Sequence, residues 1–233
     1  SAEDADAYRA SFTRNHDLRH MDLEVSFDWS KKYLYGKATI QLAPHFYPKD
    51  QVILNARGMQ INRLALIDGN DTTNLNYTYQ NDSLFIATKT YKKDEIIKLF
   101  IDYVSRPDEL KDVGGSQAIS SDKGLYFINP DGKDPQKPMQ IWTQGETQAS
   151  SVWFPTIDAP NQKFTHQISI TIGKEFKTLS NGLMIKSTDN PDGTRTDVWR
   201  QDLPHAPYLV MMAIGPFKVV GDKWRNIDVN YYV

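Results

Sequence analysis

The chain has 233 residues, enough for one large domain or two small ones, and either would bury a sizeable core. Its 27 basic and 29 acidic side chains give a net charge of −2, so nothing in the balance favours binding to nucleic acid or to an anionic membrane surface. Cysteine is absent, which excludes disulfides, thiolate metal ligands and a thiol nucleophile. No apolar run approaches the roughly 20 residues of a membrane-spanning helix, so we expect a folded chain with no membrane span.

The first third of the chain alternates apolar and polar residues, which is the period of a half-buried strand. Leu23, Val25, Phe27 and Trp29 share one face of the first such segment, and residues 34–42 alternate in the same way. The short polar connection between the two segments predicts a β-hairpin. Further strands are expected where β-favouring runs lie between Gly, Asn, Asp and Lys clusters. These runs are residues 51–55, 60–68, 75–79, 83–87 and 96–104.

The middle of the chain, residues 105–138, is punctuated by Gly and Pro turns and has one strand candidate, at 124–128. We interpret it as a functional loop, because a linker would lack its aromatic residues Tyr126 and Phe127. β-Patterning then resumes in four runs: 166–172, 194–200, 208–214 and 227–233. Since no helical stripe exceeds a turn or two, the sequence predicts one all-β domain of more than a dozen mostly antiparallel strands in two or more sheets.

Both ends of the chain look cut. The strand-like run Asp228 to Val233 reaches the last residue without a polar tail, and Ser1 stands where an initiator Met would be. We therefore expect residues 1–233 to be a fragment excised from a longer protein, and the resemblance described below implies that it is a single amino-terminal β domain.

The five histidines prompt a search for a metal site. His16 and His20 have the i, i+4 spacing of half an HExxH zinc helix, but Asp17 replaces the glutamate. On the strand expected here, residues four apart lie roughly 13 Å from one another, too far to share one zinc ion. The remaining histidines have no ligand spacing: His45, His166 and His205. We therefore expect no metal and no other cofactor in this chain, and no nucleophile, phosphate-loop or dinucleotide motif is present either.

The segment Gln140 to Thr147 carries the most chemical information. Gln144 and Glu146 are two residues apart, so an extended chain would place both on one face. Nearby aromatic residues at 142, 153 and 154 would form an apolar wall. A carboxylate and an amide beside such a wall suit an ammonium group, although a solvated glutamate at a strand edge is the simpler alternative.

Five elements follow one another along the chain, and the first is the hairpin of residues 21–42. The other four are the motifs Thr-Gln-Gly-Glu at 143–146, Trp-Phe-Pro-x-x-Asp-x-Pro-x-x-Lys at 153–163, Leu-Ser-Asn-Gly at 179–182 and Tyr-Leu-Val-Met-Met-Ala-Ile-Gly at 208–215. Together they resemble the amino-terminal domain of the gluzincin aminopeptidases of the aminopeptidase N and leukotriene hydrolase type.

The resemblance implies a large saddle-like β-sandwich of several sheets, packed on a thermolysin-like catalytic domain of the same chain. It implies that the element matching Gln144, Gly145 and Glu146 projects into the active site and holds the free α-amine of a peptide. Gly145, where some relatives have a larger residue, would leave room for the side chain of the first substrate residue.

The zinc-binding elements of that family are missing from these 233 residues. There is no Gly-x-Met-Glu-Asn strand and no His-Glu-x-x-His with its downstream glutamate. The resemblance therefore implies a parent zinc aminopeptidase whose Zn²⁺ is held beyond Val233, and we expect this chain alone to be inactive.

Two other functions are compatible with the residues. The chain could be a stand-alone β-sandwich module that binds peptide or carbohydrate on Trp142, Trp153 and Phe154, or a purely structural domain with these aromatics in its core. The compartment is left open, although export is favoured over the cytoplasm for two reasons. A scavenging peptidase is expected outside the cytoplasm, and removal of an export signal would explain the missing initiator Met.

Overall fold

The computed structural model describes residues 13–111 and 122–233. In these residues the regular structure is strand, apart from three single turns of 3-10 helix. The turns are η1 (Pro107–Glu109), η2 (Ser150–Val152) and η3 (Pro207–Leu209). None of them has the length or the apolar composition that crossing a membrane requires. The predicted all-β class is confirmed.

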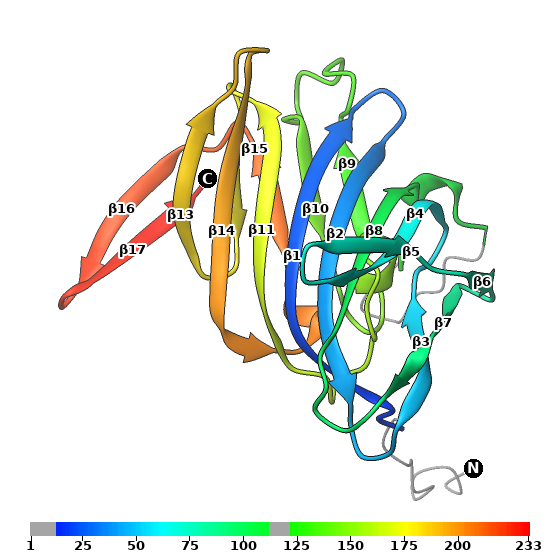
Figure 1. Ribbon diagram of the computed structural model, residues 1–233. Coiled ribbons are helices and arrows are strands. Elements are labelled where there is room, and N and C mark those ends of the chain that lie inside the picture. The colour runs from blue at the N-terminus through cyan, green and yellow to red at the C-terminus, as the bar shows by residue number, and fades with distance from the viewer. Residues whose placement is uncertain (1–12, 112–121) are drawn as a thin grey trace, which may run out of the picture.

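The largest sheet has eight strands in the order β13-β14-β11-β1-β2-β8-β4-β5 (Figure 1). The pairing of β1 with β11 is parallel, and every other pairing among the described strands of this sheet is antiparallel. This agrees with the prediction of mostly antiparallel strands. The strands are β1 (His16–Asp28), β2 (Tyr33–Pro44), β4 (Met59–Asp68), β5 (Asp71–Asn74), β8 (Ile97–Ser105), β11 (Phe164–Gly173), β13 (Leu183–Asp189) and β14 (Thr194–His205).

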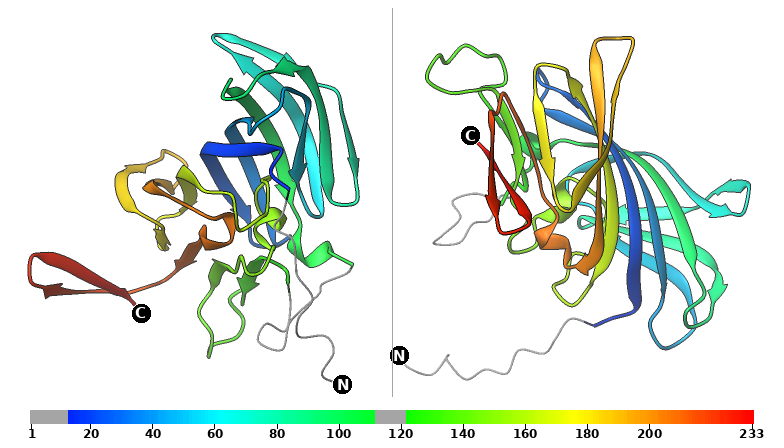
Figure 2. Two further views of the ribbon diagram at one scale, coloured as in Figure 1. Left: turned by 90° about the horizontal axis from the view of Figure 1, so that it is seen from below. Right: turned by 90° about the vertical axis from the view of Figure 1, so that its left-hand side faces the viewer.

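Smaller sheets complete the domain. A four-stranded sheet has the order β12 (Lys177–Ser180), β15 (Met212–Gly215), β10 (Gln140–Thr143) and β9 (Leu125–Ile128). A three-stranded sheet has the order β3 (Lys49–Asn55), β7 (Ser83–Tyr91) and β6 (Tyr77–Gln80). The last two strands, β16 (Val219–Trp224) and β17 (Ile227–Tyr232), form a hairpin that projects from the rest (Figure 2).

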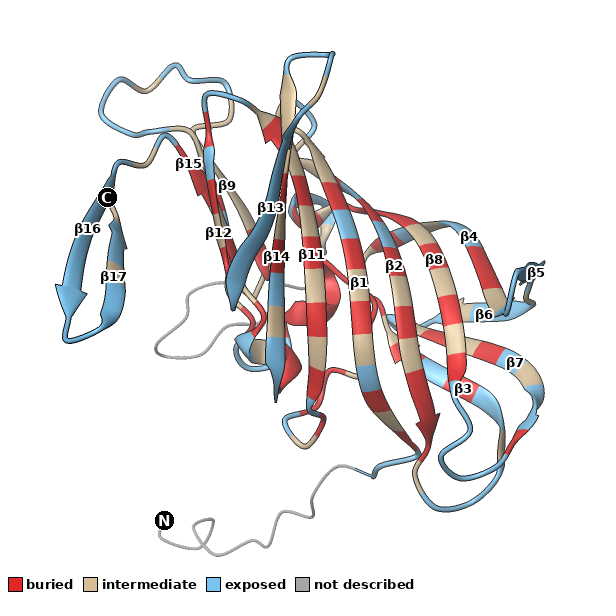
Figure 3. Ribbon diagram, turned by 60° about the vertical axis from the view of Figure 1, so that its left-hand side comes forward, coloured by how far each residue is buried: buried red, intermediate tan, exposed pale blue. Residues whose placement is uncertain are grey.

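The large sheet buries one face and exposes the other, which explains its period-two sequence (Figure 3). In β11, Ile168, Ile170 and Ile172 are buried while their neighbours are half-exposed. The same buried cluster contains Leu54 of the three-stranded sheet and Ile141 of the four-stranded sheet. The three sheets therefore share one hydrophobic core.

The predicted hairpin of residues 21–42 is present as β1 and β2, and a glycine in β2 allows close packing against β8. Gly36 lies beside Tyr103 of β8, and a Cβ at position 36 would stand 2.6 Å from Cε1 of that ring. The buried Tyr103 hydroxyl donates to the backbone oxygen of Trp153 at 2.7 Å. This bond ties the large sheet to the segment that follows η2.

Some strand predictions were wrong. The strand expected at 75–79 is present as β6, although it begins two residues later, at Tyr77. The expected strand at 208–214 begins as η3 and becomes β15 only at Met212. Five strands were not in the predicted ranges: β5, β10, β12, β13 and β16. His16 and His20 do lie on a strand, β1, which confirms the reason for setting aside a zinc helix there.

Candidate functional site

The candidate site begins where β10 ends, at Thr143. β10 is paired with β9 on one side and β15 on the other, and the Thr143 hydroxyl accepts a hydrogen bond from the Met212 backbone N–H at 3.0 Å. One residue later, the backbone N–H of Gln144 donates to the carbonyl of Gly124 at 3.0 Å. The start of the predicted amine-binding element is therefore held between two neighbouring strands.

The chain then turns, and this differs from the extended segment that the sequence predicted. Gln144 is half-buried and Gly145 buried, while Glu146 is exposed in a turn closed by a hydrogen bond from the Ala149 N–H to the Gly145 oxygen, 2.9 Å long. Within the described residues, no hydrogen bond or ion pair engages the side chain of Gln144 or Glu146. Both side chains are thus available to a ligand. They do not lie on one face of a strand, as the sequence predicted, because β10 ends at Thr143.

Gly145 is packed tightly against the chain itself. A Cβ at this position would stand 2.7 Å from Ser150 Oγ and from Tyr208 Cα and would collide with the Tyr208 carbonyl oxygen. Ser150 Oγ in turn donates to the Pro207 oxygen at 2.9 Å, so η2 and η3 are joined behind the turn. The structure therefore supplies a packing reason for glycine here, distinct from the extra room for a substrate suggested by the sequence.

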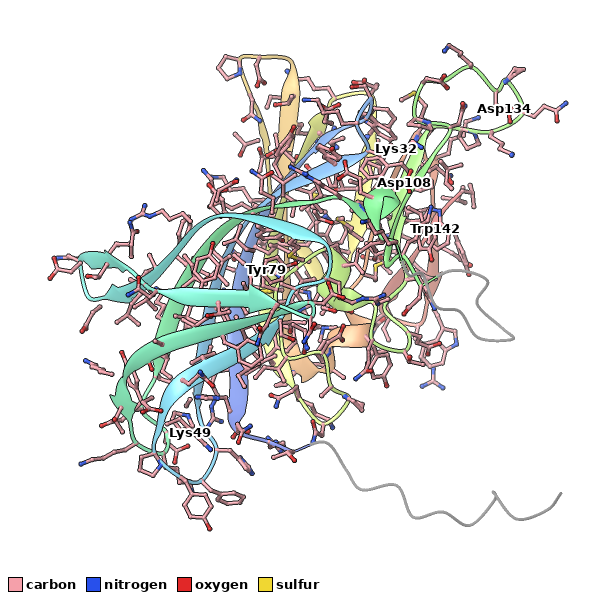
Figure 4. All side chains as sticks on the ribbon, turned by 90° about the vertical axis from the view of Figure 1, so that its right-hand side faces the viewer. Lys32, Lys49, Tyr79, Asp108, Asp134 and Trp142 are labelled. Carbon is pink, nitrogen blue, oxygen red and sulfur yellow. The ribbon has the colours of Figure 1, made fainter. Side chains whose placement is uncertain are left out.

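The predicted aromatic wall does not exist as a surface, because two of its three members are buried. Trp153 and Phe154 are both 0% exposed and pack edge to face in the core with centroids 4.5 Å apart. Trp142, which Figure 4 labels, is the exception because it is 38% exposed. Its ring stacks on Tyr126 of β9 with centroids 4.5 Å apart. The expectation of a Trp142, Trp153 and Phe154 platform is wrong, since the irregular segment after β10 turns the latter two inward.

Trp142 belongs to an apolar row across the outer face of the four-stranded sheet. In register with it lie Tyr126 on one side and Ala213 on the other, and Ala213 is in turn opposite Leu179. Alternate residues of the same strands, such as Ile141 and Ile214, are fully buried on the core face. The row therefore lies on the side of the sheet away from the core and adjoins the segment that carries Glu146. The sequence marked Tyr126 as an aromatic residue of the middle segment, but not as a neighbour of Trp142.

A polar cleft of about 260 Å³ lies next to the turn. It is lined by Thr147, Gln148 and Asp158, with Arg57 and Asp122 across from them. Arg57 Nη1 lies 3.0 Å from Asp122 Oδ2. Burial raises the pKa of Asp158 to about 6, although a backbone N–H from Ser151 and the charge of Arg57 oppose the shift. Sequence patterns gave no signal for Arg57, because its link to this segment is a long-range contact.

The described residues offer no donor set for a metal ion. No three His, Cys, Asp or Glu side chains among them are grouped closely enough to hold one. Pairs of such side chains do occur: His45 Nδ1 lies 2.9 Å from Asp17 Oδ2, and His166 and His205 share a hydrogen bond of 3.2 Å. The described part of this chain therefore has no set of residues that fits the zinc implied by the family resemblance.

The several sheets around one core are the kind of all-β domain that the resemblance implied. Residues 16–209 match the family model described as "Peptidase M1 N-terminal domain", and the chain belongs to that family. This confirms the resemblance seen in the sequence.

Several known proteins are similar to this chain. The bovine (Bos taurus) glutamyl aminopeptidase is 36% identical over 81 residues, which are 34% of this chain and 8% of the relative. Transcription initiation factor TFIID subunit 2 of Danio rerio is 22% identical over 240 residues, covering 91% of this chain and 20% of that protein. The chain therefore spans a fifth or less of the length of these two curated relatives.

Solved structures show the same fold. The crystal structure of an M1 zinc metallopeptidase mutant from Deinococcus radiodurans bound to the substrate Tyr-Ser-Ala superimposes with a TM-score of 0.75 at 15% identity. The match covers 93% of this chain and 47% of that one.

Proposed function

We propose that this chain is the amino-terminal domain of a zinc aminopeptidase and that Glu146, assisted by Gln144, binds the free α-amine of the peptide substrate. The observation that carries the proposal is the turn after β10. Its backbone is fixed by β9, β15 and η3, whereas the side chains of Gln144 and Glu146 have no partner within the described residues. A held backbone with two unengaged polar side chains suits ligand binding.

The chemistry of such an anchor follows from charge. A glutamate carboxylate accepts a charge-assisted hydrogen bond from an ammonium group, and the Gln144 amide oxygen can accept a second. Binding the amine fixes the register of the peptide, so that its first peptide bond and no other reaches the reacting centre. The match to a glutamyl aminopeptidase and the substrate-bound M1 relative support this function.

The proposed partner in cis is the catalytic domain, and the exposed apolar surface suggests where it packs. The row around Trp142 adjoins the anchor. The β16–β17 hairpin exposes five more large apolar side chains: Val219, Val220, Trp224, Ile227 and Tyr231. Apolar patches of this kind mark interaction surfaces in folded proteins. We expect the backbone amides of β16 and β17 to exchange more slowly in the full-length protein than in the 233-residue chain, and equal exchange would contradict this placement.

The anchor is tested by Glu146→Ala in the full-length protein with amino-acyl anilides as substrates. Loss of a hydrogen bond to a charged group predicts a fall in kcat/KM of about 10- to 150-fold. Glu175→Ala is the matched control, because Glu175 is an exposed glutamate in the turn before β12. Unchanged kinetics in Glu146→Ala would remove the assignment. The 233-residue chain alone, even with added Zn²⁺, should hydrolyse none of these substrates.

A second function is favoured by one comparison. The match to TFIID subunit 2, a transcription factor by name, extends over 91% of this chain, so a scaffold without peptidase activity is also proposed as a candidate. A full-length protein that lacks an HExxH helix and has no aminopeptidase activity would support the scaffold. The stand-alone module that binds peptide or carbohydrate on three aromatic side chains loses support, because Trp153 and Phe154 are in the core.

A further inference from the structure

The segment that carries Glu146 is held by one buried carboxylate further along the chain. Asp158 is 5% exposed, and its Oδ2 accepts a hydrogen bond from the Ser151 backbone N–H at 2.9 Å. Its backbone oxygen accepts a second hydrogen bond, from Gln148 Nε2, also at 2.9 Å. A single residue therefore holds both ends of the stretch from 148 to 151, which begins two residues after Glu146.

Asp158 is itself fixed to a different part of the fold. Its backbone N–H donates to Asn55 Oδ1 at 3.0 Å, and Asn55 exchanges two backbone hydrogen bonds of 2.7 and 3.0 Å with Thr156. The Ser151 oxygen accepts from the Arg57 N–H at 2.8 Å. The position of the turn is thus set by the end of β3, in the three-stranded sheet, through Asp158 and its neighbours.

The charged groups that face Asp158 come from three other segments of the chain. Arg57, just after β3, lies on the cleft with Asp122 and with Asp82 of the β6–β7 turn. The Arg57 guanidinium forms an ion pair with Asp122, and its Nη1 is also 3.5 Å from the Gln148 carbonyl oxygen. Arg57 favours the ionised form of Asp158, Asp122 disfavours it, and burial raises its pKa to about 6. The ionised carboxylate, which predominates at neutral pH, accepts a stronger hydrogen bond from the Ser151 N–H than the protonated carboxyl does.

We propose that Asp158 is a positioning residue for the amine anchor: its buried carboxylate holds Ser151 and its backbone oxygen holds Gln148, and these contacts set the course of the segment 146–151 and thereby the point at which Glu146 meets the substrate amine. This inference rests on the proposed function of Glu146. Glu146 is exposed and its own side chain is unrestrained within the described residues, so its placement depends on the backbone that bears it. A displacement of about 1 Å in a binding group can cost up to about 100-fold in rate.

The test is a double-mutant cycle on kcat/KM in the full-length protein, using Asp158→Ala, Glu146→Ala and the double variant. If Asp158 acts through Glu146, Asp158→Ala lowers kcat/KM by about tenfold in the wild type and by less than about twofold when Glu146 is already Ala. Equal losses in both backgrounds would overturn the positioning role. A Glu146→Ala variant with unchanged kinetics would instead refute the proposed function itself.

Asp158→Asn keeps the proposal testable if the alanine variant fails to fold, because its side-chain oxygen still accepts from Ser151. The kcat/KM of Asp158→Asn divided by that of the wild type should be lowest above pH 7, where the wild-type carboxyl is charged. The same ratio should approach one below pH 5, where the wild-type carboxyl is also neutral. A ratio independent of pH would contradict the role of the charge. Asp82→Asn is the matched control, because Asp82 lies in the same cleft and bonds to Gly58 instead of the turn.

Discussion

The imidazole rings of His166 and His205 stack on each other with centroids 5.0 Å apart, and the Nδ1 of His166 lies 3.2 Å from the Nε2 of His205. His166 is fully buried on β11, and its Nε2 has no partner within the described residues. Burial, and then the nearby charges of His205 and His20, lower the pKa of His166 to about 3. The folded protein therefore holds His166 in its neutral form.

This arrangement predicts a loss of stability in mild acid. When the pKa of a histidine is lower in the folded protein than its unfolded value of 6.5, its contribution to the free energy of unfolding is fully present above pH 6.5. That contribution is lost as the pH falls, because the unfolded chain then binds a proton that the folded protein does not. His16, whose pKa burial lowers to about 4, acts in the same direction, whereas Asp158, whose pKa is raised to about 6, acts in the opposite one. The free energy of unfolding, measured in urea between pH 6 and 4.5, should therefore fall. His166→Phe should reduce this slope by about 1.4 kcal/mol per pH unit, and an unchanged slope would contradict the assignment.

A second prediction concerns the buried Asp197 of β14, which is 2% exposed. Burial opposes its ionisation, but hydrogen bonds from Arg195, Ser187 and Thr178 outweigh this and hold its pKa below the usual value. Asp197→Ala leaves the Arg195 guanidinium without its carboxylate and should lower the free energy of unfolding by about 3–5 kcal/mol.

The control for Asp197 is on the same strand. Asp202 forms an ion pair of 2.7 Å with Arg200, but its side chain is 71% exposed. Asp202→Ala should change the free energy of unfolding by less than about 1 kcal/mol, because exposed ion pairs contribute little. If urea unfolding gave the same loss of unfolding free energy for both variants, burial of Asp197 would not explain its contribution to stability.

The strands that could be predicted from the sequence are those with one buried face. β11 alternates strictly because the core touches every second residue, and β1 and β2 do so except at the irregularity between Leu18 and His20 and at the buried end of β2, residues 42–44. β13 was missed for the opposite reason: all seven of its residues are exposed, so nothing imposes a period of two on its sequence. The exposed strand β16 was missed in the same way.

The candidate site could be predicted only in part. The segment Gln140 to Glu146 stood out by its residue types and by its similarity to a family motif. Its turn did not, because the contacts that end the strand come from Tyr208, Gly124 and other distant residues. The contact between Asp158 and Asn55 joins residues 103 positions apart, which no local pattern encodes.

Two tryptophans that looked equivalent in the sequence should respond differently to truncation. Trp153 is 0% exposed, so Trp153→Ala should cost about 3–5 kcal/mol of unfolding free energy through lost burial and a cavity. Trp142 is 38% exposed and its main contact is the Tyr126 ring, so Trp142→Ala should cost only about 0.5–1.5 kcal/mol. Urea unfolding of both variants measures the difference, and a larger loss for Trp142 would contradict the described packing.

The last prediction tests the packing beside the anchor. Gly145→Ala adds a Cβ that would meet Ser150 Oγ at 2.7 Å and collide with the Tyr208 carbonyl, so the turn and η3 must move apart. Overpacking of this kind costs about 1–3 kcal/mol, which thermal or urea unfolding of the 233-residue chain would detect. Gly221→Ala is the matched control, because its Cβ would have only Asn230 Oδ1 nearby, at 3.5 Å, on the exposed β16–β17 hairpin. If Gly145→Ala were as stable as Gly221→Ala, the close approach of Tyr208 to the anchor segment would be wrong, and space for a larger residue at position 145 would have to be reconsidered.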